Sequence, residues 1–191
     1  MKHTFVGLDF ETYSPTDLPK HGLQQYVSDP EFMPLIAAVV YRKDRGFPAE
    51  YEGALFDFVE DYDGECDRLV EELDGANIVA HNAGFEQAVL KRMGIEIPSD
   101  RFIDSAVLAR AAGAAGKLEV AGPQLLGIDK MAVGFELIKL FSIPGQYQVD
   151  HGSVAFNPKI RVDHMDEWAK FAEYCAVDAE LSLRIAAQQM R

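Results

Sequence analysis

Residues 5–11 read FVGLDFE, an apolar run of four residues followed by two acids on either side of a phenylalanine. The apolar run predicts a buried strand, in which successive side chains point to opposite faces. Asp9 and Glu11 therefore share one face, and Phe10 points to the other. Because open α/β sheets place their ligand sites at the carboxyl ends of strands, this acidic pair is a candidate functional site.

A second pattern lies near the other end of the chain, where Tyr174 precedes Asp178 by four residues. In a helix, residues four apart lie on the same face. A fold that joins this face to the acidic pair makes a cluster of carboxylates and one phenol, which cannot stay buried without cations. Oxygen ligands without His or Cys at metal spacing favour Mg²⁺ or Mn²⁺ over zinc.

Acidic pairs of this spacing are weak signals by themselves, because the chain carries 31 Asp and Glu residues. The pair at Asp9 and Glu11 follows an apolar strand, whereas the others lie in polar, loop-like surroundings and are expected to be solvated. These other pairs are Asp29/Glu31, Glu50/Glu52, Asp61/Asp63 and Asp63/Glu65. The strand context therefore distinguishes the first pair, and the distant motifs must support it.

Composition is that of a soluble globular protein, with 48% hydrophobic and 26% charged residues in 191. This length suits a single domain, residues 1–191, with a sizeable core. No apolar stretch approaches the ~20 residues that span a bilayer, and no signal peptide is recognised, so no membrane partner is expected. Two distant cysteines suggest no disulfide framework, which favours a reducing, cytoplasmic location.

The net charge of −13 argues against simple nucleic-acid binding, because phosphate contacts need Lys and Arg. Much of the acidic excess lies between residues 50 and 74, which we interpret as an outer surface. The best candidates for phosphate contacts are Lys117, Lys139, Lys159 and Arg161. Each of them can also be interpreted as an ordinary surface charge.

Hydrophobic spacing and turn residues predict strands first and then strands alternating with helices. The expected strands are residues 3–9, 33–41, 49–55, 77–80 and 101–104. The expected helices are residues 56–73, 83–93 with Asn82 as cap, 105–112, 117–126, 132–141, and a last one from a cap at Asp163 to 189. Residues 14–31 are expected to form a polar loop or short helix, and residues 142–162 a mobile loop. The order predicts an α/β fold, a mixed sheet with helices on both faces.

A third motif lies at the junction between an expected strand and helix, at His81-Asn82 and Phe85-Glu86. Helix capping and the helix dipole could explain it alone. Together with the other two motifs, it follows the order and spacing of the DEDD (DnaQ-like) superfamily of 3′–5′ exonucleases. The chain resembles in particular the proofreading exonuclease domain of phage-type family A DNA polymerases, over nearly its whole length. Tyr174 places it with the DEDDy branch.

The resemblance implies a ribonuclease-H-like fold and a two-metal-ion 3′–5′ exonuclease that releases 5′ mononucleotides from DNA 3′ ends, in proofreading or DNA processing. The implied ligands of two Mg²⁺ or Mn²⁺ ions are Asp9, Glu11, Glu86 and Asp178, and Tyr174 would orient the attacking water. Substrate contacts are expected from Thr12, His81, Asn82, Lys117 and Lys139. The implied partners are a single-stranded DNA 3′ end and a DNA polymerase, fused or separate.

Two departures from the family leave alternatives open. Glu86 stands where the superfamily usually has Asp, so direct or water-mediated metal contact are both open. The sequence stops just after the last expected helix, which is compatible with a stand-alone exonuclease or an excised polymerase domain.

Two other functions remain: a small-RNA 3′–5′ exonuclease of the same superfamily, and a non-catalytic nucleic-acid-binding scaffold with this fold.

Overall fold

A computed structural model describes residues 4–43, 49–145 and 156–190. Its strands form a five-stranded sheet in the order β3-β2-β1-β4-β5. β1 pairs antiparallel with β2, and β2 with β3, whereas β4 lies parallel to both β1 and β5. The strands are β1 (Phe5–Tyr13), β2 (Met33–Arg42), β3 (Tyr51–Asp57), β4 (Asn77–Ala80) and β5 (Phe102–Asp104). The predicted mixed α/β sheet is confirmed, and the arrangement is consistent with a ribonuclease-H-like fold.

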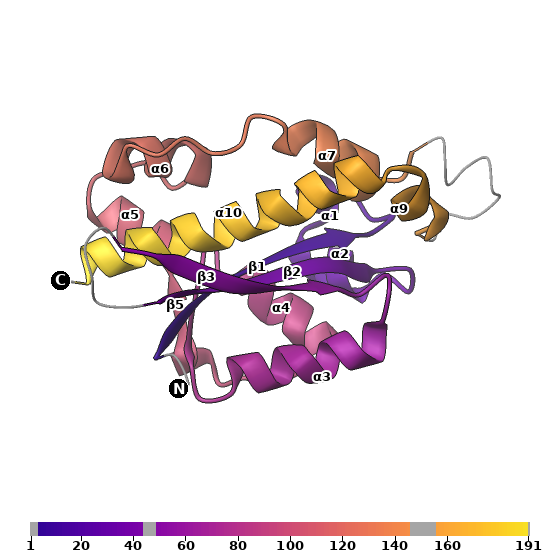
Figure 1. The fold of residues 1–191 in the computed structure, drawn as a ribbon, viewed down its shortest axis with the longest axis horizontal. Coiled ribbons are helices and arrows are strands. Elements are labelled where there is room, and N and C mark those ends of the chain that lie inside the picture. Colours follow the sequence, from indigo (N-terminus) through magenta and orange to yellow (C-terminus); the bar gives the residue numbers. More distant parts are fainter. Residues whose placement is uncertain (1–3, 44–48, 146–155, 191) are drawn as a thin grey trace.

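Helices cover both faces of this sheet, as predicted (Figure 1). α3 and α4 lie on one face, and the long α10 crosses the other with α6 and α7 beyond it. The helices are α1 (Leu18–His21), α2 (Leu23–Ser28), α3 (Tyr62–Leu73), α4 (Gly84–Arg92), α5 (Ser105–Ala111), α6 (Leu118–Leu126), α7 (Gly134–Phe141), α9 (Lys159–Asp163) and α10 (Met165–Gln189). Within the described ranges, no helix combines the length and apolar character needed to cross a membrane.

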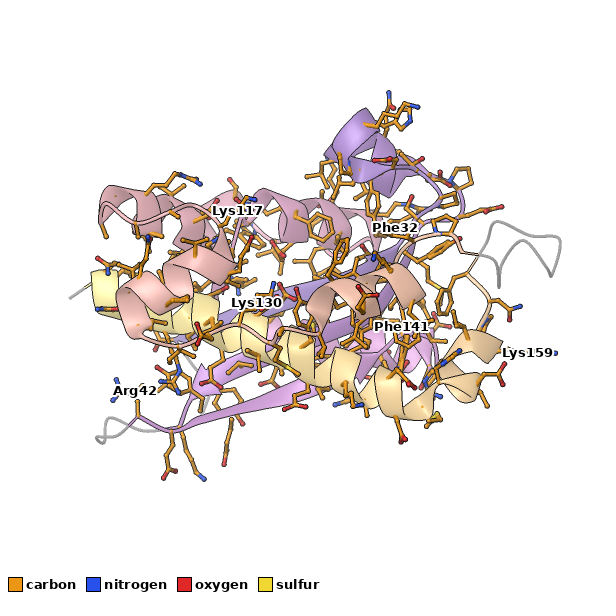
Figure 2. The ribbon with its side chains drawn as sticks, turned by 90° about the horizontal axis from the view of Figure 1, so that it is seen from above. Phe32, Arg42, Lys117, Lys130, Phe141 and Lys159 are labelled. Atoms are coloured by element: carbon orange, nitrogen blue, oxygen red, sulfur yellow. The ribbon has the colours of Figure 1, made fainter. Side chains whose placement is uncertain are left out.

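The alternation of β1 divides its side chains between two cores. Leu8 and Phe10 pack with α3 and α4, and the Phe10 ring lies 6.2 Å from that of Phe58. Tyr13 belongs to the core under α10, where Phe141 of α7 is fully buried beside α10 (Figure 2). Phe10 is thus a core residue, and the opposite face of β1 is left for its two acids.

A glycine lets α10 approach β1 closely. A Cβ added to Gly7 would lie 2.3 Å from the carbonyl oxygen of Ala179, so a larger residue would push the helix away. One turn earlier, the Cys175 thiol donates a hydrogen bond of 3.3 Å to the backbone oxygen of Asp9. These contacts fix the height of α10 over β1, and they bring Asp178 next to the acidic pair.

Some predicted boundaries were wrong because pairing and packing override local patterns. β1 continues from Asp9 to Tyr13, since its register with β2 runs from Gly7 to Tyr13. The expected helix over 56–73 begins only at Tyr62: Phe56 and Asp57 belong to β3, and Asp61 caps the helix by accepting from the Gly64 N–H at 3.0 Å.

Two predicted helix caps were also wrong. Asn82 is not the cap of α4, which starts at Gly84 without a side-chain cap; Asn82 instead has a positive φ of 64°. Asp163 ends the short helix α9, and α10 starts after His164. The predicted loop over 142–162 therefore contains a helix, while residues 146–155 of that loop lie outside the described residues.

Candidate active site

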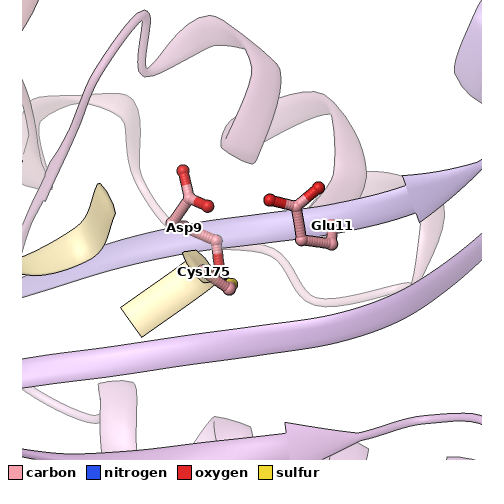
Figure 3. A group of neighbouring side chains, drawn as sticks. All are labelled: Asp9, Glu11 and Cys175. Atoms are coloured by element: carbon pink, nitrogen blue, oxygen red, sulfur yellow. Dashed lines mark hydrogen bonds between the residues drawn. The ribbon is translucent and has the colours of Figure 1, made fainter. Parts of the chain in front are cut away.

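β1 presents Asp9 and Glu11 on its α10 side, as the strand spacing predicts, and Figure 3 shows both carboxylates projecting to the same side. β4 pairs with residues Phe5 to Gly7, so the two acids lie beyond the end of that parallel pairing. The carboxylate pair thus faces the space at the carboxyl end of β4, where the chain turns into α4. The two acids were predicted to follow the end of their own strand. They lie instead within β1, and it is the neighbouring strand β4 that ends beside them.

Two helices bring the two remaining predicted ligands, Glu86 and Asp178, and the predicted water-orienting residue Tyr174 to this space. Glu86 lies in the first turn of α4, and Tyr174 and Asp178 lie on the inner face of α10; all three are buried. A pocket of about 570 Å³ is lined by all four predicted acids, Asp9, Glu11, Glu86 and Asp178. Three motifs that are distant in the sequence therefore converge in one place.

Burial and mutual repulsion both oppose the charged form of these acids. Desolvation, followed by the charge of Asp178, raises the pKa of Asp9 well above its usual value. Desolvation and the charges of Asp9 and Asp178 also raise the pKa of Glu11. Desolvation and the charge of Asp9 raise the pKa of Glu86. Raised pKa values of this origin are typical of sites that hold a cation or a proton.

Two buried carboxylate oxygens support a cation more directly. Oε2 of Glu86 and Oδ1 of Asp178 have no hydrogen-bond partner within residues 4–43, 49–145 and 156–190. A buried oxygen without a partner is costly, and native proteins rarely tolerate one without a bound water or ion. The donor set, made of carboxylate oxygens, fits a hard divalent cation such as Mg²⁺ or Mn²⁺.

Cys175 also has its sulfur near the acids: one ligand atom each of Asp9, Glu11 and Cys175 lie within 4.8 Å of one another. Burial and the neighbouring charges of Asp9 and Glu11 raise the pKa of the Cys175 thiol. A thiolate is the form that ligates metals, whereas this thiol keeps its proton and donates a hydrogen bond to the Asp9 backbone oxygen. We therefore assign Cys175 to packing.

Lys130 is the residue that sequence reasoning missed. It lies between α6 and α7, and its Nζ is 2.5 Å from Oδ2 of Asp178 and 4.5 Å from the ring centroid of Tyr174. Figure 2 shows Lys130 near the middle of α10. No spacing in the sequence relates Lys130 to the three acidic motifs, so no pattern pointed to it.

Of the two predicted substrate contacts at the junction after β4, His81 is engaged with the protein through both ring nitrogens. His81 Nδ1 lies 2.9 Å from the Ser105 hydroxyl, and Nε2 lies 2.9 Å from the Gly116 carbonyl oxygen. The Nε2 proton therefore donates to Gly116, and burial lowers the His81 pKa. His81 still lines the 570 Å³ pocket, with its ring held in a fixed orientation.

Asn82 and Thr12 differ in their availability. The Asn82 side chain is exposed at the pocket, while its backbone N–H donates to Asp104 Oδ1 at 3.1 Å. Asp104 also caps α5. The Thr12 hydroxyl is buried on the other face of β1, 2.8 Å from the Tyr26 hydroxyl. Asn82 is thus the better placed of the two to meet a ligand.

The four candidate phosphate contacts do not gather in one place: Lys117 precedes α6, Lys139 lies on α7, and Lys159 and Arg161 both lie on α9. Lys117 is 80% exposed and 4.0 Å from Glu119, and Lys139 pairs with Glu136 at 3.3 Å. Lys159 is the first residue of α9, at one end of the molecule (Figure 2). None of these three lines the pocket with the acids.

Arg161 is a structural residue. Its guanidinium donates to Asp57 at 2.7 Å and also to Glu60, and Trp168 Nε1 donates to the same Asp57 oxygen at 2.8 Å. These bonds tie α9 and α10 to the end of β3. Arg161 therefore holds these elements together and does not line the pocket with the acids.

Comparison with known proteins finds similarity to a DNA polymerase. The chain is 27% identical over 184 residues to a DNA polymerase of Bacillus phage SP02. The match covers 94% of this chain and 27% of the polymerase, so the chain spans about a quarter of that protein's length. No protein-family model matches the chain. The similarity is consistent with a polymerase-associated domain.

Proposed function

We propose that the chain is a metal-dependent 3′–5′ exonuclease that acts on single-stranded or frayed DNA 3′ ends. The observation that carries this proposal is the convergence of four carboxylates from β1, α4 and α10, with Glu86 Oε2 and Asp178 Oδ1 buried and unpartnered within the described part of the chain. The similarity to a phage DNA polymerase supports DNA as the substrate.

In this proposal the four acids hold two divalent ions. Asp9, Glu11 and Asp178 would hold one, and Asp9 and Glu86 the other. When bound, Mg²⁺ or Mn²⁺ ions would lower the pKa of a ligated water, and their positive charge would stabilise both the attacking and the leaving oxygen. The chemistry is hydrolysis: water adds to the terminal phosphorus, the bond to the preceding nucleotide's 3′ oxygen breaks, that oxygen takes a proton, and a 5′ mononucleotide leaves.

Tyr174 acts through its neutral hydroxyl in this proposal. Burial and the charges of Asp178 and Glu11 raise its pKa far above the usual value, and a hydrogen bond to Asp178 acts in the same direction. A phenol that stays protonated cannot serve as a general base near neutral pH. We therefore assign Tyr174 to orienting the attacking water.

The acidic balance of the chain bears on its partner. With a net charge of −13 and its candidate lysines at three different helices, α6, α7 and α9, the chain offers few phosphate contacts. Affinity for nucleic acid rises with the number of phosphates neutralised. We propose that a DNA polymerase, fused or separate, supplies the missing affinity for the 3′ end.

The experiment is digestion of a single-stranded DNA oligonucleotide labelled at its 5′ end, in Mg²⁺, in Mn²⁺ and in EDTA. The proposal predicts a ladder of progressively shorter labelled products in either metal and none in EDTA. A ribo-oligonucleotide of the same sequence tests the sugar: faster digestion of RNA would favour the small-RNA exonuclease. Internal cleavage, or no cleavage in either metal, would contradict the proposal.

A further inference from the structure

Lys130 makes two contacts inside the candidate active site. Its ammonium lies 2.5 Å from Oδ2 of Asp178, and the Lys130 side chain is only 19% exposed. The same Nζ lies 4.5 Å from the centroid of the Tyr174 ring, a distance at which a cation is attracted by the ring face. Lys130 is therefore a partly buried charge held by two proposed active-site residues.

Asp178 and its lysine partner line different cavities. Asp178 lines the 570 Å³ pocket together with the other acids, whereas Lys130 and Tyr174 line a separate cavity of about 460 Å³. Lys130 thus reaches Oδ2 from the second cavity. Oδ1 has no partner within the described residues, so the carboxylate can bind a cation without first losing the lysine.

The charge of Lys130 acts on more than its direct partner. Burial raises the pKa values of Asp9, Glu11 and Asp178, and the charge of Lys130 opposes this rise in all three. The ammonium therefore stabilises the charged form of the cluster as a whole. A divalent ion among these carboxylates would lie close enough to the ammonium to be repelled by it.

We propose that Lys130 is the resident counter-charge of the carboxylate site: it positions Asp178 while no divalent ion is bound, and it weakens the binding of that ion. The inference rests on the proposed function, since it requires a divalent ion at the four acids. Lys130 then sets the metal concentration at which the site fills. Removal of its charge should destabilise the metal-free protein and tighten metal binding.

The test is a Mn²⁺ titration by calorimetry, together with thermal melting with and without Mn²⁺, in mildly alkaline buffer. Lys130→Met should melt below wild type without metal, because Asp178 loses its partner. It should bind Mn²⁺ about tenfold more tightly, which corresponds to about 1.4 kcal/mol. The rise in melting temperature on adding Mn²⁺ should accordingly be larger in Lys130→Met than in wild type.

Two variants control for other effects. Lys130→Arg keeps the charge and should retain the wild-type Mn²⁺ affinity. Lys170→Met removes an exposed lysine one helical turn before Tyr174 and should leave Mn²⁺ affinity unchanged. Lys130→Gln is a second neutral variant, from which the same tightening is expected if Lys130→Met does not fold.

The outcomes separate this inference from the proposed function. If wild type binds Mn²⁺ and the neutral variants bind it equally or more weakly, the role of Lys130 is overturned while the metal site stands. If wild type binds no Mn²⁺ even at high concentration, the metal-dependent function fails and this inference fails with it.

Discussion

The ring of Tyr174 packs directly against Gly134 at the start of α7: a Cβ added to Gly134 would lie 2.1 Å from Cε2 of that ring. No side chain larger than hydrogen fits there without moving the tyrosine. On another side, the Tyr174 ring stacks on Phe171, with centroids 6.4 Å apart. The position of the phenol at the acids is therefore set by packing around the ring.

Gly134→Ala tests this packing. Alanine normally stabilises a helix by up to about 1 kcal/mol relative to glycine. Here we expect the opposite, a lower melting temperature and slower exonuclease turnover, because the new methyl group displaces Tyr174. In a Tyr174→Ala background the clash is gone, so Gly134→Ala should then raise the melting temperature. A rise in both backgrounds would show that Tyr174 is not confined by Gly134.

Asp9→Asn tests the central acid. Turnover should fall by several orders of magnitude, since Asp9 is proposed to hold both ions, while the metal-free melting temperature should stay level or rise because repulsion within the cluster is relieved. Asp63→Asn is the matched control, from an exposed acid-x-acid pair on α3, and should keep the wild-type rate. Substantial metal-dependent cleavage by Asp9→Asn would refute the assignment.

Glu86 is tested by changing its length and its charge separately. Glu86→Asp keeps the carboxylate and, if the contact to metal runs through water, should lose no more than about tenfold in turnover, or about 1.4 kcal/mol in barrier. Glu86→Gln keeps the shape without the charge and should lose much more. Equal large losses in both variants would indicate a direct ligand, and no loss in either would leave Glu86 with a helix-dipole role alone.

The pH dependence of stability follows from the raised carboxyl pKa values. Above the usual values of 3.8 for Asp and 4.5 for Glu, the folded protein holds protons that the unfolded chain has lost. Metal-free stability should therefore fall as pH rises from these values through the raised pKa values of Asp9, Glu11 and Glu86.

Divalent metal should reverse this trend, because Mn²⁺ binds the deprotonated acids. The increase in melting temperature on adding Mn²⁺ should grow with pH over the same range. Melting curves at a series of pH values, with Mn²⁺ and with EDTA, measure both effects. A metal-free melting temperature that rises with pH across this window would contradict the assignment of these buried acids.

Local periodicity was sufficient to predict which faces of β1 and α10 carry the candidate site residues. Strand alternation placed Asp9 and Glu11 together, and helical spacing placed Tyr174 with Asp178. The end of β1 could not be predicted, because pairing with β2 extends the strand to Tyr13. Such pairing depends on a partner distant in the sequence, which no local pattern encodes.

Side-chain contacts between segments that are distant in the sequence could not be predicted either. Lys130 meets Asp178, which lies 48 positions later in the chain, and Arg161 meets Asp57, which lies 104 positions earlier. Both are charges in polar segments, where a surface position is the ordinary expectation. His81 was expected to face the substrate, but Ser105 and Gly116, which bind both its ring nitrogens, are brought to it only by the tertiary fold.

The central claim is that the acids of β1, α4 and α10 form a two-metal site, and a crystal structure with Mn²⁺ and a 5′ deoxynucleoside monophosphate tests it most directly. Anomalous scattering at a wavelength sensitive to manganese locates the ions without assumptions about the protein. The account predicts two ions, with Asp9 in contact with both and Asp178 in contact with one. Manganese bound elsewhere, or absent from these acids at saturating concentration, would contradict it.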